Sequence, residues 1–448
     1  MKRRTMMNGK HGKYMTVLYT RPCDCGGNCL YCIKETGVTR STIPNQDTLL
    51  ASQVNWSSAK QLLARCEAEG IVLGQGNKFE LRIKGNSFTN YPPEYLEGYI
   101  KDVYDLLNGW VSDSFEEAFI GQENAADRVV QIVIETRPDQ ITEQWCDYMR
   151  KWGVTTVEIG VQSLNDGVLA ANNRGHLTDV VRSAAKLIRS YGFELGFQVM
   201  LGLWGSSREI DVDMLTGALW QEEYYPDTLK IYPTLLLPNE DAQRPMYDLF
   251  HKGKWSPIGD EEYDVFLREV LPYIPYDVHV NRLQRIFTES EVAYGPFKII
   301  DRTKYRGISK CMWQRSFQNS GCDYTDIKDW HYVITSHENH YTVQCVTNDD
   351  VLLGYGRLSV DGNVGYLRDL RVLGDPIHIG ETSDRTQSLQ HMGIGREMLS
   401  ALEAIAKNGG ANECVIYSSA GCVSYFTKLG YKKVNHYTLV KDITDCIK

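Results

Sequence analysis

Residues 23–32 read CDCGGNCLYC, which places four cysteines within ten residues of a 448-residue chain. An apolar, β-branched segment at 16–20 precedes them, so the cysteines are expected on a loop that follows a first strand. Cys25, Cys29 and Cys32 have C-x3-C-x2-C spacing. Three thiolates at this spacing can each bind one iron of a cubane cluster and leave the fourth iron open to a chelating substrate.

Two alternatives stay open at this stretch. Cys23 is an alternative first ligand, because it has C-x5-C-x2-C spacing with Cys29 and Cys32, which a longer loop also satisfies. Four closely spaced cysteines can also wrap a structural zinc ion, although zinc motifs usually draw on two separated pairs of ligands.

Strands and helices alternate through the first two thirds of the chain. Apolar, β-branched segments predict six strands, at 16–20, 79–84, 129–136, 155–163, 193–201 and 228–237. Helical patterns lie between them, at 59–70, 92–107, 141–152, 178–191 and 206–222. This alternation predicts an α/β fold with a parallel sheet, and six repeats suit an open, partial (β/α)6 barrel better than a closed barrel of eight strands. Functional side chains are then expected at the carboxyl ends of the strands.

The pattern changes after residue 286. Residues 305–330 show no clear period and are expected to form an ordered linker. A smaller mixed α/β unit follows, with strands near 341–347, 351–360, 366–372 and 413–417 and helices near 396–407 and 421–429. The predicted organisation is a basic segment at 1–22, a barrel domain at 14–290, a linker with a candidate metal element at 291–330 and an acyltransferase-sized domain at 331–448.

A glycine-containing loop near the end of the chain is a candidate anion site. Residues 390–395 read QHMGIG, directly ahead of a predicted helix. Gly393 and Gly395 let backbone N–H groups turn inward at the helix N-terminus, whose partial positive charge suits a pyrophosphate. The candidate binding residues are Gln390, His391, Met392, Gly393, Ile394, Gly395 and Arg396. A tight helix entry without a ligand is the alternative.

The charge distribution bears on a nucleic-acid partner. The net charge of -9 argues against one, but the segment 1–22 has six basic side chains and no acidic one. These candidate phosphate contacts are Lys2, Arg3, Arg4, Lys10, Lys13 and Arg21. A solvated terminus is the alternative.

The sequence also bears on the compartment. No apolar run approaches the ~20 residues needed to cross a bilayer, and the basic N-terminus lacks the apolar core of a secretion signal. Of the twelve cysteines, four lie at 23–32 and the rest are scattered, which favours reduced thiols and metal ligation over disulfides. We therefore expect a cytoplasmic protein without a membrane partner.

The cysteine loop resembles that of the radical S-adenosylmethionine (radical SAM) superfamily, in which an aromatic residue such as Tyr31 commonly precedes the last cysteine. This resemblance implies a partial six-stranded barrel that binds a 4Fe-4S cluster and S-adenosylmethionine. Residues 366–431 are similar to the Gcn5-related acetyltransferase (GNAT) fold. That similarity implies acetyl-CoA at the glycine loop and places Tyr425, with Phe426 beside it, close to the thioester.

Nearly the whole chain resembles the family of Elongator catalytic subunits. The matching motifs are Glu135-Thr136-Arg137-Pro138-Asp139, Val157-Glu158-Ile159-Gly160-Val161-Gln162-Ser163, Asn173-Arg174-Gly175-His176, Lys230-Ile231-Tyr232-Pro233-Thr234 and Tyr425-Phe426. The resemblance implies a tRNA anticodon loop as partner and a wobble-uridine modification enzyme that forms a 5-carboxymethyl-type uridine from acetyl-CoA by radical SAM chemistry. Histone acetylation has also been attributed to the family, so a protein lysine acetyltransferase with the barrel as a scaffold is the alternative.

The resemblance implies which residues contact S-adenosylmethionine. These are polar residues at strand ends and in the loops that follow them: Glu135, Arg137, Glu158, Gln162 and Arg174. A structural ion pair of either glutamate with Arg174 is the alternative, because polar residues inside a barrel often only satisfy one another.

Three residues are implied as catalytic. Lys230 and Tyr232, at the end of the sixth predicted strand, are expected to contact the uridine or the acetyl group, and Tyr425 is expected at the thioester. A Lys230 side chain that merely covers the barrel rim is the alternative.

The chain departs from the family in the linker. The family's cysteine-rich zinc element is matched only by Cys311 and Cys322, and Gln314 stands where a further cysteine is expected. Two thiols alone do not make a closed zinc site, so a zinc ion is doubtful here. The sequence does not decide the oligomeric state, and a homodimer stays open.

Overall fold

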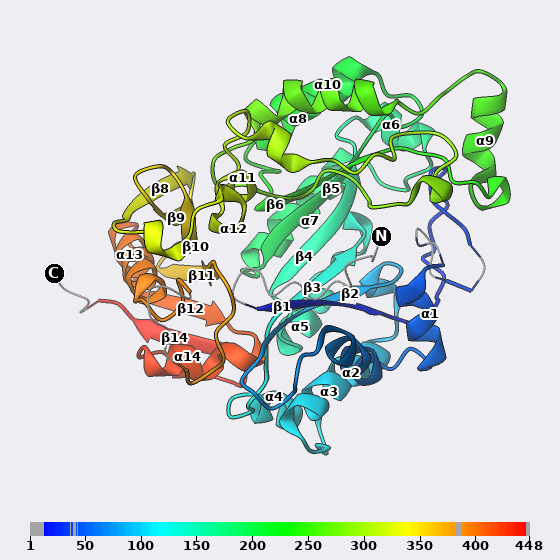
Figure 1. Cartoon of the computed structure of the whole chain (residues 1–448). Helices are drawn as coiled ribbons and strands as arrows, with labels where there is room; N and C mark the ends of the chain where they lie inside the picture. Colours follow the sequence, from blue (N-terminus) through cyan, green and yellow to red (C-terminus); the bar gives the residue numbers. More distant parts are fainter. Residues whose placement is uncertain (1–12, 36, 39–41, 43, 382–387, 445–448) are drawn as a thin grey trace.

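The structure, a computed structural model, describes residues 13–35, 37–38, 42, 44–381 and 388–444 (Figure 1). Two seven-stranded sheets organise these residues, one in each part of the chain. Four of the predicted phosphate contacts lie outside the described residues: Lys2, Arg3, Arg4 and Lys10.

The first sheet is parallel, and its strands follow one another in chain order. Its strands are β1 Tyr14–Tyr19, β2 Lys78–Lys84, β3 Arg128–Thr136, β4 Thr156–Gln162, β5 Glu194–Leu201, β6 Thr228–Pro233 and β7 His279–Arg282. The six predicted strands match β1 to β6 closely, and the predicted open, partial barrel is confirmed. β7 was not predicted, because a four-residue edge strand leaves little periodic signal.

Helices follow the strands of this sheet and cover its outer face (Figure 1). They are α1 Gln46–Gln53, α2 Ser58–Glu69, α3 Pro93–Asn108, α4 Phe115–Gly121, α5 Glu143–Lys151, α6 Asp166–Ala171, α7 Thr178–Ser190, α8 Arg208–Thr216, α9 Arg244–His251 and α10 Asp260–Val270. Local signals set several ends: Pro93 opens α3, and Gly70 stops α2 with a φ of 69°. The helix predicted at 206–222 ends earlier, at Thr216, because Gly217 follows it.

The two faces of the parallel sheet differ in chemistry. Alternate residues of β2, namely Phe79, Leu81 and Ile83, belong to the hydrophobic core beneath the helices. The intervening residues of β2 are charged and face inward, where they meet Glu135 of β3 and Glu158 of β4. Strands of a parallel sheet are normally apolar on both faces, so the charged inner face marks the functional part of the barrel.

The second sheet is mixed and has the order β13-β14-β12-β11-β10-β9-β8. Its strands are β8 His331–His337, β9 His340–Val346, β10 Leu352–Asp361, β11 Val364–Val372, β12 Glu413–Tyr417, β13 Lys432–Lys433 and β14 Thr438–Asp442. Its helices are α13 Ile394–Asn408 and α14 Val423–Lys428, and the short helices α11 Met312–Arg315 and α12 Phe317–Ser320 lie in the linker. The four strands and two helices predicted for this part are present, whereas β8, β13 and β14 were not predicted.

Buried ion pairs join the two parts of the chain. Asp227, just ahead of β6, accepts hydrogen bonds from Arg368 of β11 at 2.6 Å and from Arg357 of β10 at 3.1 Å. Glu194, at the start of β5, pairs with Arg371 at 2.7 Å. These acidic residues lie at the amino ends of the barrel strands, so the second domain packs against the end opposite to the cysteine loop.

The electrostatic environment of Asp227 favours its charged form. Burial alone would raise the pKa of this carboxyl, but Arg368 and Arg357 outweigh burial and hold the pKa well below its usual range. A carboxyl with a depressed pKa contributes its full stabilisation above its unfolded pKa of about 3.9. This contribution is lost as the pH falls from about 3.9 to the lower pKa of the folded state.

We predict that Asp227→Ala lowers the free energy of unfolding by about 3 to 5 kcal/mol at pH 7, because it leaves two buried guanidinium groups without their shared carboxylate. Urea unfolding followed by circular dichroism measures the loss. The difference from wild type should shrink below about pH 4. Asp361→Ala, which alters an exposed aspartate of β10, is the control, and an equal effect of both substitutions would contradict the role of the buried pairs.

Candidate functional site

The cysteine loop lies at the carboxyl end of β1 and is anchored to the neighbouring structure. The backbone N–H of Leu30 donates to the carbonyl of Asn172, at the end of α6, at 3.1 Å. Cys29 is buried, with 7% of its surface exposed, and Cys25 and Cys32 are half-buried. The loop is therefore folded against the barrel.

Two arginines surround the Cys29 thiol. The Sγ atom lies 3.7 Å from Arg137 Nη1 and 3.6 Å from Arg174 Nη1. Arg137 is held in turn by Asp139 and by the carbonyl of Arg174, each at 2.9 Å or less. Burial raises the pKa of the Cys29 thiol, but Arg174, Tyr31 and Arg137 together outweigh burial, so the pKa falls below its usual value. The surroundings of this cysteine favour the thiolate, which is the form that binds metals.

Cys23 and Cys25 turn in different directions. Cys23 Sγ lies 3.8 Å from both the carbonyl oxygen and the side-chain amide of Asn90. Cys25 Sγ instead accepts a hydrogen bond from the Gly27 backbone N–H at 3.4 Å. A Cβ atom on Gly27 would lie 2.6 Å from Arg137 Nη1, so only glycine lets the loop approach this arginine so closely. Cys25 thus lies on the side of the loop that carries Arg137 and Cys29.

The inner face of the barrel holds a network of ion pairs. Lys230 Nζ donates to Glu135 Oε1 at 2.7 Å and also to Glu158. Lys84 Nζ lies 3.4 Å from the same oxygen of Glu135, and Arg82 Nη1 lies 3.4 Å from Glu158 Oε1. Three cations therefore share two carboxylates in this network.

This network bears on two structural alternatives, an ion pair of either glutamate with Arg174 and a Lys230 side chain on the barrel rim. Glu135 and Glu158 pair with Lys230 and not with Arg174, whose guanidinium donates to the carbonyl of Gly160 at 2.5 Å and lies against Cys29. Lys230 is only 2% exposed, so it does not cover the rim of the barrel. The predicted catalytic role of Lys230 is not tested by this geometry and stays a prediction.

Lys84 has an unusual electrostatic environment that sequence analysis did not detect. Burial lowers its pKa to about 7, although Glu135 opposes this shift. By contrast, Glu135 and Glu158 outweigh burial at Lys230 and raise the pKa of that lysine. Two neighbouring lysines therefore differ in proton affinity, because the carboxylates bind one of them more closely.

Unpaired polar atoms lie at the carboxyl end of β2. Asn86 is 7% exposed, and within the described residues neither of its side-chain amide atoms has a hydrogen-bond partner. The Nε atom of Arg174 is likewise buried and unpaired in this part of the chain. Orphaned buried polar atoms are costly, so these groups fit a polar ligand such as S-adenosylmethionine. Asn86 was not predicted as a binding residue.

Two other predicted site residues lie close to this network. Gln162 ends β4 with a φ of 69°, and its amide lies over Gly160, where a Cβ atom would come within 2.7 Å of it. Tyr232, in β6, is half-buried. The pairing of β4 with β5 is irregular between Gly160 and Gln162, which gives the end of the strand its unusual backbone.

The glycine loop has the geometry expected of a helix N-terminal anion site. His391 and Gly393 have positive φ angles of 65° and 90°, and α13 begins at Ile394. Lys78 Nζ, from the start of β2, donates to Gln390 Oε1 at 2.5 Å. Turned backbone N–H groups at the start of a 15-residue helix fit a pyrophosphate.

Tyr425 lies beside this loop. A Cβ atom on Gly395 would lie 3.2 Å from the Tyr425 hydroxyl, and the tyrosine is 43% exposed. Phe426 is 8% exposed and packs against Tyr431 with 5.9 Å between ring centroids. Phe426 is therefore part of the core behind Tyr425, a position that supports the tyrosine.

The cysteine loop and the glycine loop lie at opposite ends of the barrel, and β2 runs between them. Its inward side chains are Lys78, Glu80, Arg82 and Lys84. Lys78 contacts the glycine loop and Lys84 contacts Glu135. At a rise of ~3.3 Å per residue, six residues of a strand span roughly 20 Å. A line of charged side chains thus connects the two candidate sites.

The linker contains the two cysteines of the candidate metal element. Cys311 is buried and Cys322 is half-buried. Among the described residues, no group of three or more histidine, cysteine, aspartate or glutamate side chains is arranged around an ion-sized point. Arg302 instead stacks on Trp313, with 3.4 Å from its guanidinium carbon to the ring centroid. Cation–π stacking helps to hold this segment.

One predicted phosphate contact is wrong. Lys13 is 7% exposed and forms an ion pair with Glu80 at 3.0 Å inside the barrel, so it is not available to RNA. Arg21 is exposed and lies 4.5 Å from the ring centroid of Tyr95, and its predicted contact with RNA is not tested.

No helix in the described part of the chain is long and apolar enough to cross a membrane.

Two family matches cover the two parts of the chain. Residues 21–213 match the radical SAM superfamily, and residues 304–431 match the acetyltransferase (GNAT) family. The cysteine loop lies in the first match, and the glycine loop and Tyr425 lie in the second.

Individual proteins match over greater lengths. A protein of Dehalococcoides mccartyi called tRNA uridine(34) acetyltransferase is 29% identical, over 94% of this chain and 96% of its own. Elongator complex protein 3 of Homo sapiens is 26% identical, over 81% of this chain and 69% of its own. The structure of Methanocaldococcus infernus Elp3 with an N-terminal deletion superimposes with a TM-score of 0.79 at 25% identity, over 96% of this chain and 99% of that one.

We predict that Lys84 titrates near pH 7, so that it is charged at pH 6 and mostly neutral at pH 8. The carbon next to its ammonium group reports the titration in NMR spectra of 13C-lysine-labelled protein, and Lys84→Gln identifies the signal. Glu135→Gln should lower this pKa further, because it removes the charge that opposes burial. A titration near pH 10 would contradict the prediction.

The same shift has a consequence for stability. Between pH 7 and about 10.4 the unfolded chain binds a proton that the folded Lys84 has lost. Stability rises with pH wherever the unfolded state binds more protons, so the free-energy cost of burying Lys84 shrinks as the pH increases through this window.

Proposed function

Because this chain is an Elp3-type protein, in which a radical SAM domain precedes a GNAT domain, we propose that it modifies the wobble uridine of tRNA with a group derived from acetyl-CoA. The observation that carries the proposal is the line of inward charges on β2, which joins the glycine loop to the ion pairs below the cysteine loop. A reaction that needs both sites requires such a connection within one protein. Relatives named tRNA uridine(34) acetyltransferase support the substrate.

We propose that Cys25, Cys29 and Cys32 bind the 4Fe-4S cluster and that Cys23 does not. The Cys25 and Cys29 thiols lie on the side of the loop next to Arg137, whereas Cys23 turns toward Asn90. When bound, the cluster and S-adenosylmethionine supply the means to abstract a hydrogen atom from an unactivated carbon. The role of the loop is to hold thiolates, and the cationic surroundings of Cys29 favour that form.

The polar groups at the barrel mouth are proposed to bind S-adenosylmethionine. The unpaired amide of Asn86 and the Nε atom of Arg174 offer hydrogen bonds, and Glu135 offers a carboxylate that is 30% exposed on its side chain. Gln162 lies beside Arg174 over Gly160. Arg137 is engaged by Asp139 and the Arg174 carbonyl, so its contribution is to hold the loop and Cys29 in place.

Acetyl-CoA is proposed to bind with its pyrophosphate on residues 390–396 and its thioester near Tyr425. The Tyr425 hydroxyl lies against Gly395 at the start of α13, where it can donate a hydrogen bond to the thioester oxygen. Lys230 and Tyr232 are proposed to position the uridine from within the barrel. A carbon radical formed at the acetyl methyl by hydrogen abstraction would add to uridine C5, and loss of the C5 proton and of one electron, which the oxidised cluster could accept, would restore the base. Hydrolysis of the thioester would then leave a 5-carboxymethyl-type uridine and free CoA.

We predict that Cys25→Ser reduces bound iron to the background level and that Cys23→Ser leaves it unchanged. After anaerobic reconstitution, bound iron and acid-labile sulfide are measured, and the visible absorbance of the cluster is recorded. The two variants replace the same residue type at positions two residues apart, so each is the control for the other. Iron loss in Cys23→Ser alone would assign the first ligand to Cys23.

We predict that the reduced, iron-loaded protein forms a carboxymethyl-type uridine when it is incubated anaerobically with S-adenosylmethionine, acetyl-CoA and tRNA. Mass spectrometry of the digested nucleosides measures the product. The double variant Cys29→Ala, Cys32→Ala should form neither this product nor 5′-deoxyadenosine. Tyr425→Phe should still form 5′-deoxyadenosine but lower the yield of modified uridine by about 100-fold, since loss of a single donor to a thioester-type oxyanion has effects of this order.

Other outcomes separate the alternatives. Acetyl-lysine on added protein substrates, without modified uridine, would favour the lysine acetyltransferase. Formation of 5′-deoxyadenosine without a modified nucleoside would show a working radical site whose substrate is not the one proposed.

A further inference from the structure

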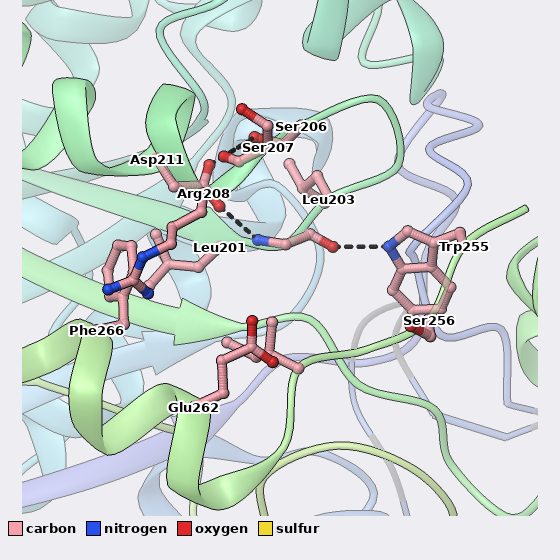
Figure 2. Close-up of a pocket in the computed structure, with 12 residues that line it drawn as sticks. Leu201, Leu203, Ser206, Ser207, Arg208, Asp211, Trp255, Ser256, Glu262 and Phe266 are labelled. Atoms are coloured by element: carbon pink, nitrogen blue, oxygen red, sulfur yellow. Dashed lines mark hydrogen bonds between the residues drawn. The ribbon is translucent and has the colours of Figure 1, made fainter.

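A cavity lies outside the inner face of the barrel, beside the end of β5. Its volume is about 150 Å³, and helices α8 and α10 border it (Figure 2). Trp255 and Phe266 lie on opposite sides of it, and Asp211 and Glu262 contribute carboxylates. Neither the cysteine loop nor the glycine loop supplies a residue to its lining.

Hydrogen bonds fix the walls of this cavity. The Asp211 carboxylate accepts from the Gly202 backbone N–H at 2.7 Å and from the Ser206 hydroxyl at 2.7 Å. The Trp255 indole N–H donates to the Gly202 carbonyl at 2.8 Å. The loop after β5 therefore holds an aromatic ring and a carboxylate in fixed positions, as expected of a preformed binding site.

The cavity is on the helix side of the sheet. Side chains of a strand alternate between its two faces. Leu201, which lines the cavity, belongs to the core beneath the helices, as do Phe197 and Val199. Gln198 alternates with these residues and pairs in register with Lys230. A ligand in this cavity is thus separated by the sheet from the base that would react near Lys230.

Despite this separation, hydrogen bonds through Asn172 link the segment that follows β5 to the cysteine loop. The Asn172 side chain donates to the Trp204 carbonyl at 2.7 Å, and the Asn172 carbonyl accepts from Leu30 at 3.1 Å. Trp255 also packs against the apolar cluster that Leu30 and Tyr31 contact. The walls of the cavity are therefore connected to the cysteine loop through Asn172 and through this apolar cluster.

The size and chemistry of the cavity restrict its ligand. A cavity of about 150 Å³ accommodates one benzene-sized ring. The carboxylates of Asp211 and Glu262 disfavour a phosphate or carboxylate in the cavity, because Arg208 at its edge is already paired with Glu269. A neutral six-membered ring with N–H donors satisfies both limits, since carboxylates accept from N–H groups and the aromatic walls contact the ring faces.

The chain next to Trp255 suits a nucleotide. Lys254 directly precedes Trp255, Lys252 lies three residues before it, and both lysines are exposed. Basic side chains beside an aromatic ring are typical of surfaces that bind single-stranded nucleic acid, where the cations contact phosphates and the rings stack on bases. Bases of an anticodon loop are accessible for such stacking.

We propose that this cavity binds a pyrimidine base of the tRNA anticodon loop other than the uridine that is modified. The proposal rests on the proposed function. A second base held on the helix side orients the RNA so that the target uridine faces the inner side of the barrel. Trp255 is in this sense a positioning residue for the RNA.

The test uses a synthetic anticodon stem–loop RNA and a series in which each loop nucleotide in turn lacks its base. Binding to the iron-loaded full-length protein is measured by fluorescence anisotropy. For the wild-type protein, base removal at one pyrimidine besides the target should weaken binding about 5- to 100-fold, the range expected for loss of one stacked base. In Trp255→Ala the same base removal should cause no further loss, and Trp255→Phe should restore most of the effect.

Controls make each outcome decisive. Trp110→Ala removes an exposed tryptophan from the loop between α3 and α4 and should leave the wild-type pattern. Ser256→Phe fills the entrance and should abolish the effect if Trp255→Ala does not fold. Equal losses in wild type and Trp255→Ala, or an effect confined to purine positions, would overturn the proposal. Quenching of Trp255 fluorescence by free uridine or cytidine, without any effect of base removal in RNA, would assign the cavity to a free pyrimidine and overturn the RNA contact.

The same preparations are assayed for modified uridine. If base removal weakens binding to the wild type but not to Trp255→Ala, and the wild type modifies no uridine, the RNA-binding site stands and the proposed reaction fails. If uridine is modified but every base removal has the same effect on binding to the wild type and to Trp255→Ala, the reaction stands and the proposed base site fails.

Discussion

The charged inner face of the half-barrel is the constraint on which the rest of the structure depends. Burying Lys230, which is 2% exposed, is tolerable only because Glu135 and Glu158 both accept its hydrogen bonds. Glu135 also pairs with Lys84, and Glu158 also pairs with Arg82, so charged side chains of β2, β3, β4 and β6 neutralise one another. The strands must keep their register to preserve this pairing, and the polar lumen that results is suited to charged cofactors.

The same principle sets the position of the second domain. Asp227 and Glu194 stand at the amino ends of β6 and β5, and the arginines of β10 and β11 complete their pairing. The GNAT domain therefore docks at the end of the barrel opposite to the cysteine loop, with its glycine loop against the start of β2. The inner face, lined by the charged side chains of β2, extends from one loop to the other.

Much of this arrangement is visible in the sequence, and the exceptions have physical causes. The runs that form β1 to β6 are long and β-branched, so periodicity locates them, whereas β7 and β13 are too short to show a period. The motif residues identify Glu135, Glu158 and Lys230, but not their mutual pairing, because sequence spacing does not determine contacts between strands. Lys13 was predicted as a phosphate contact from charge alone. A basic residue directly before a strand is equally able to turn inward, and Glu80 provides the partner that makes this possible.

Two family matches in one chain suggest two independent modules, but the buried ion pairs between the domains argue against their independence. Separation of the domains would leave Arg357 and Arg368, 2% and 8% exposed here, on a bare face of the GNAT sheet, and would expose an acidic surface on the barrel. Each domain therefore buries charged groups that the other domain neutralises, so the charges of this interface are balanced in the pair and not in either half.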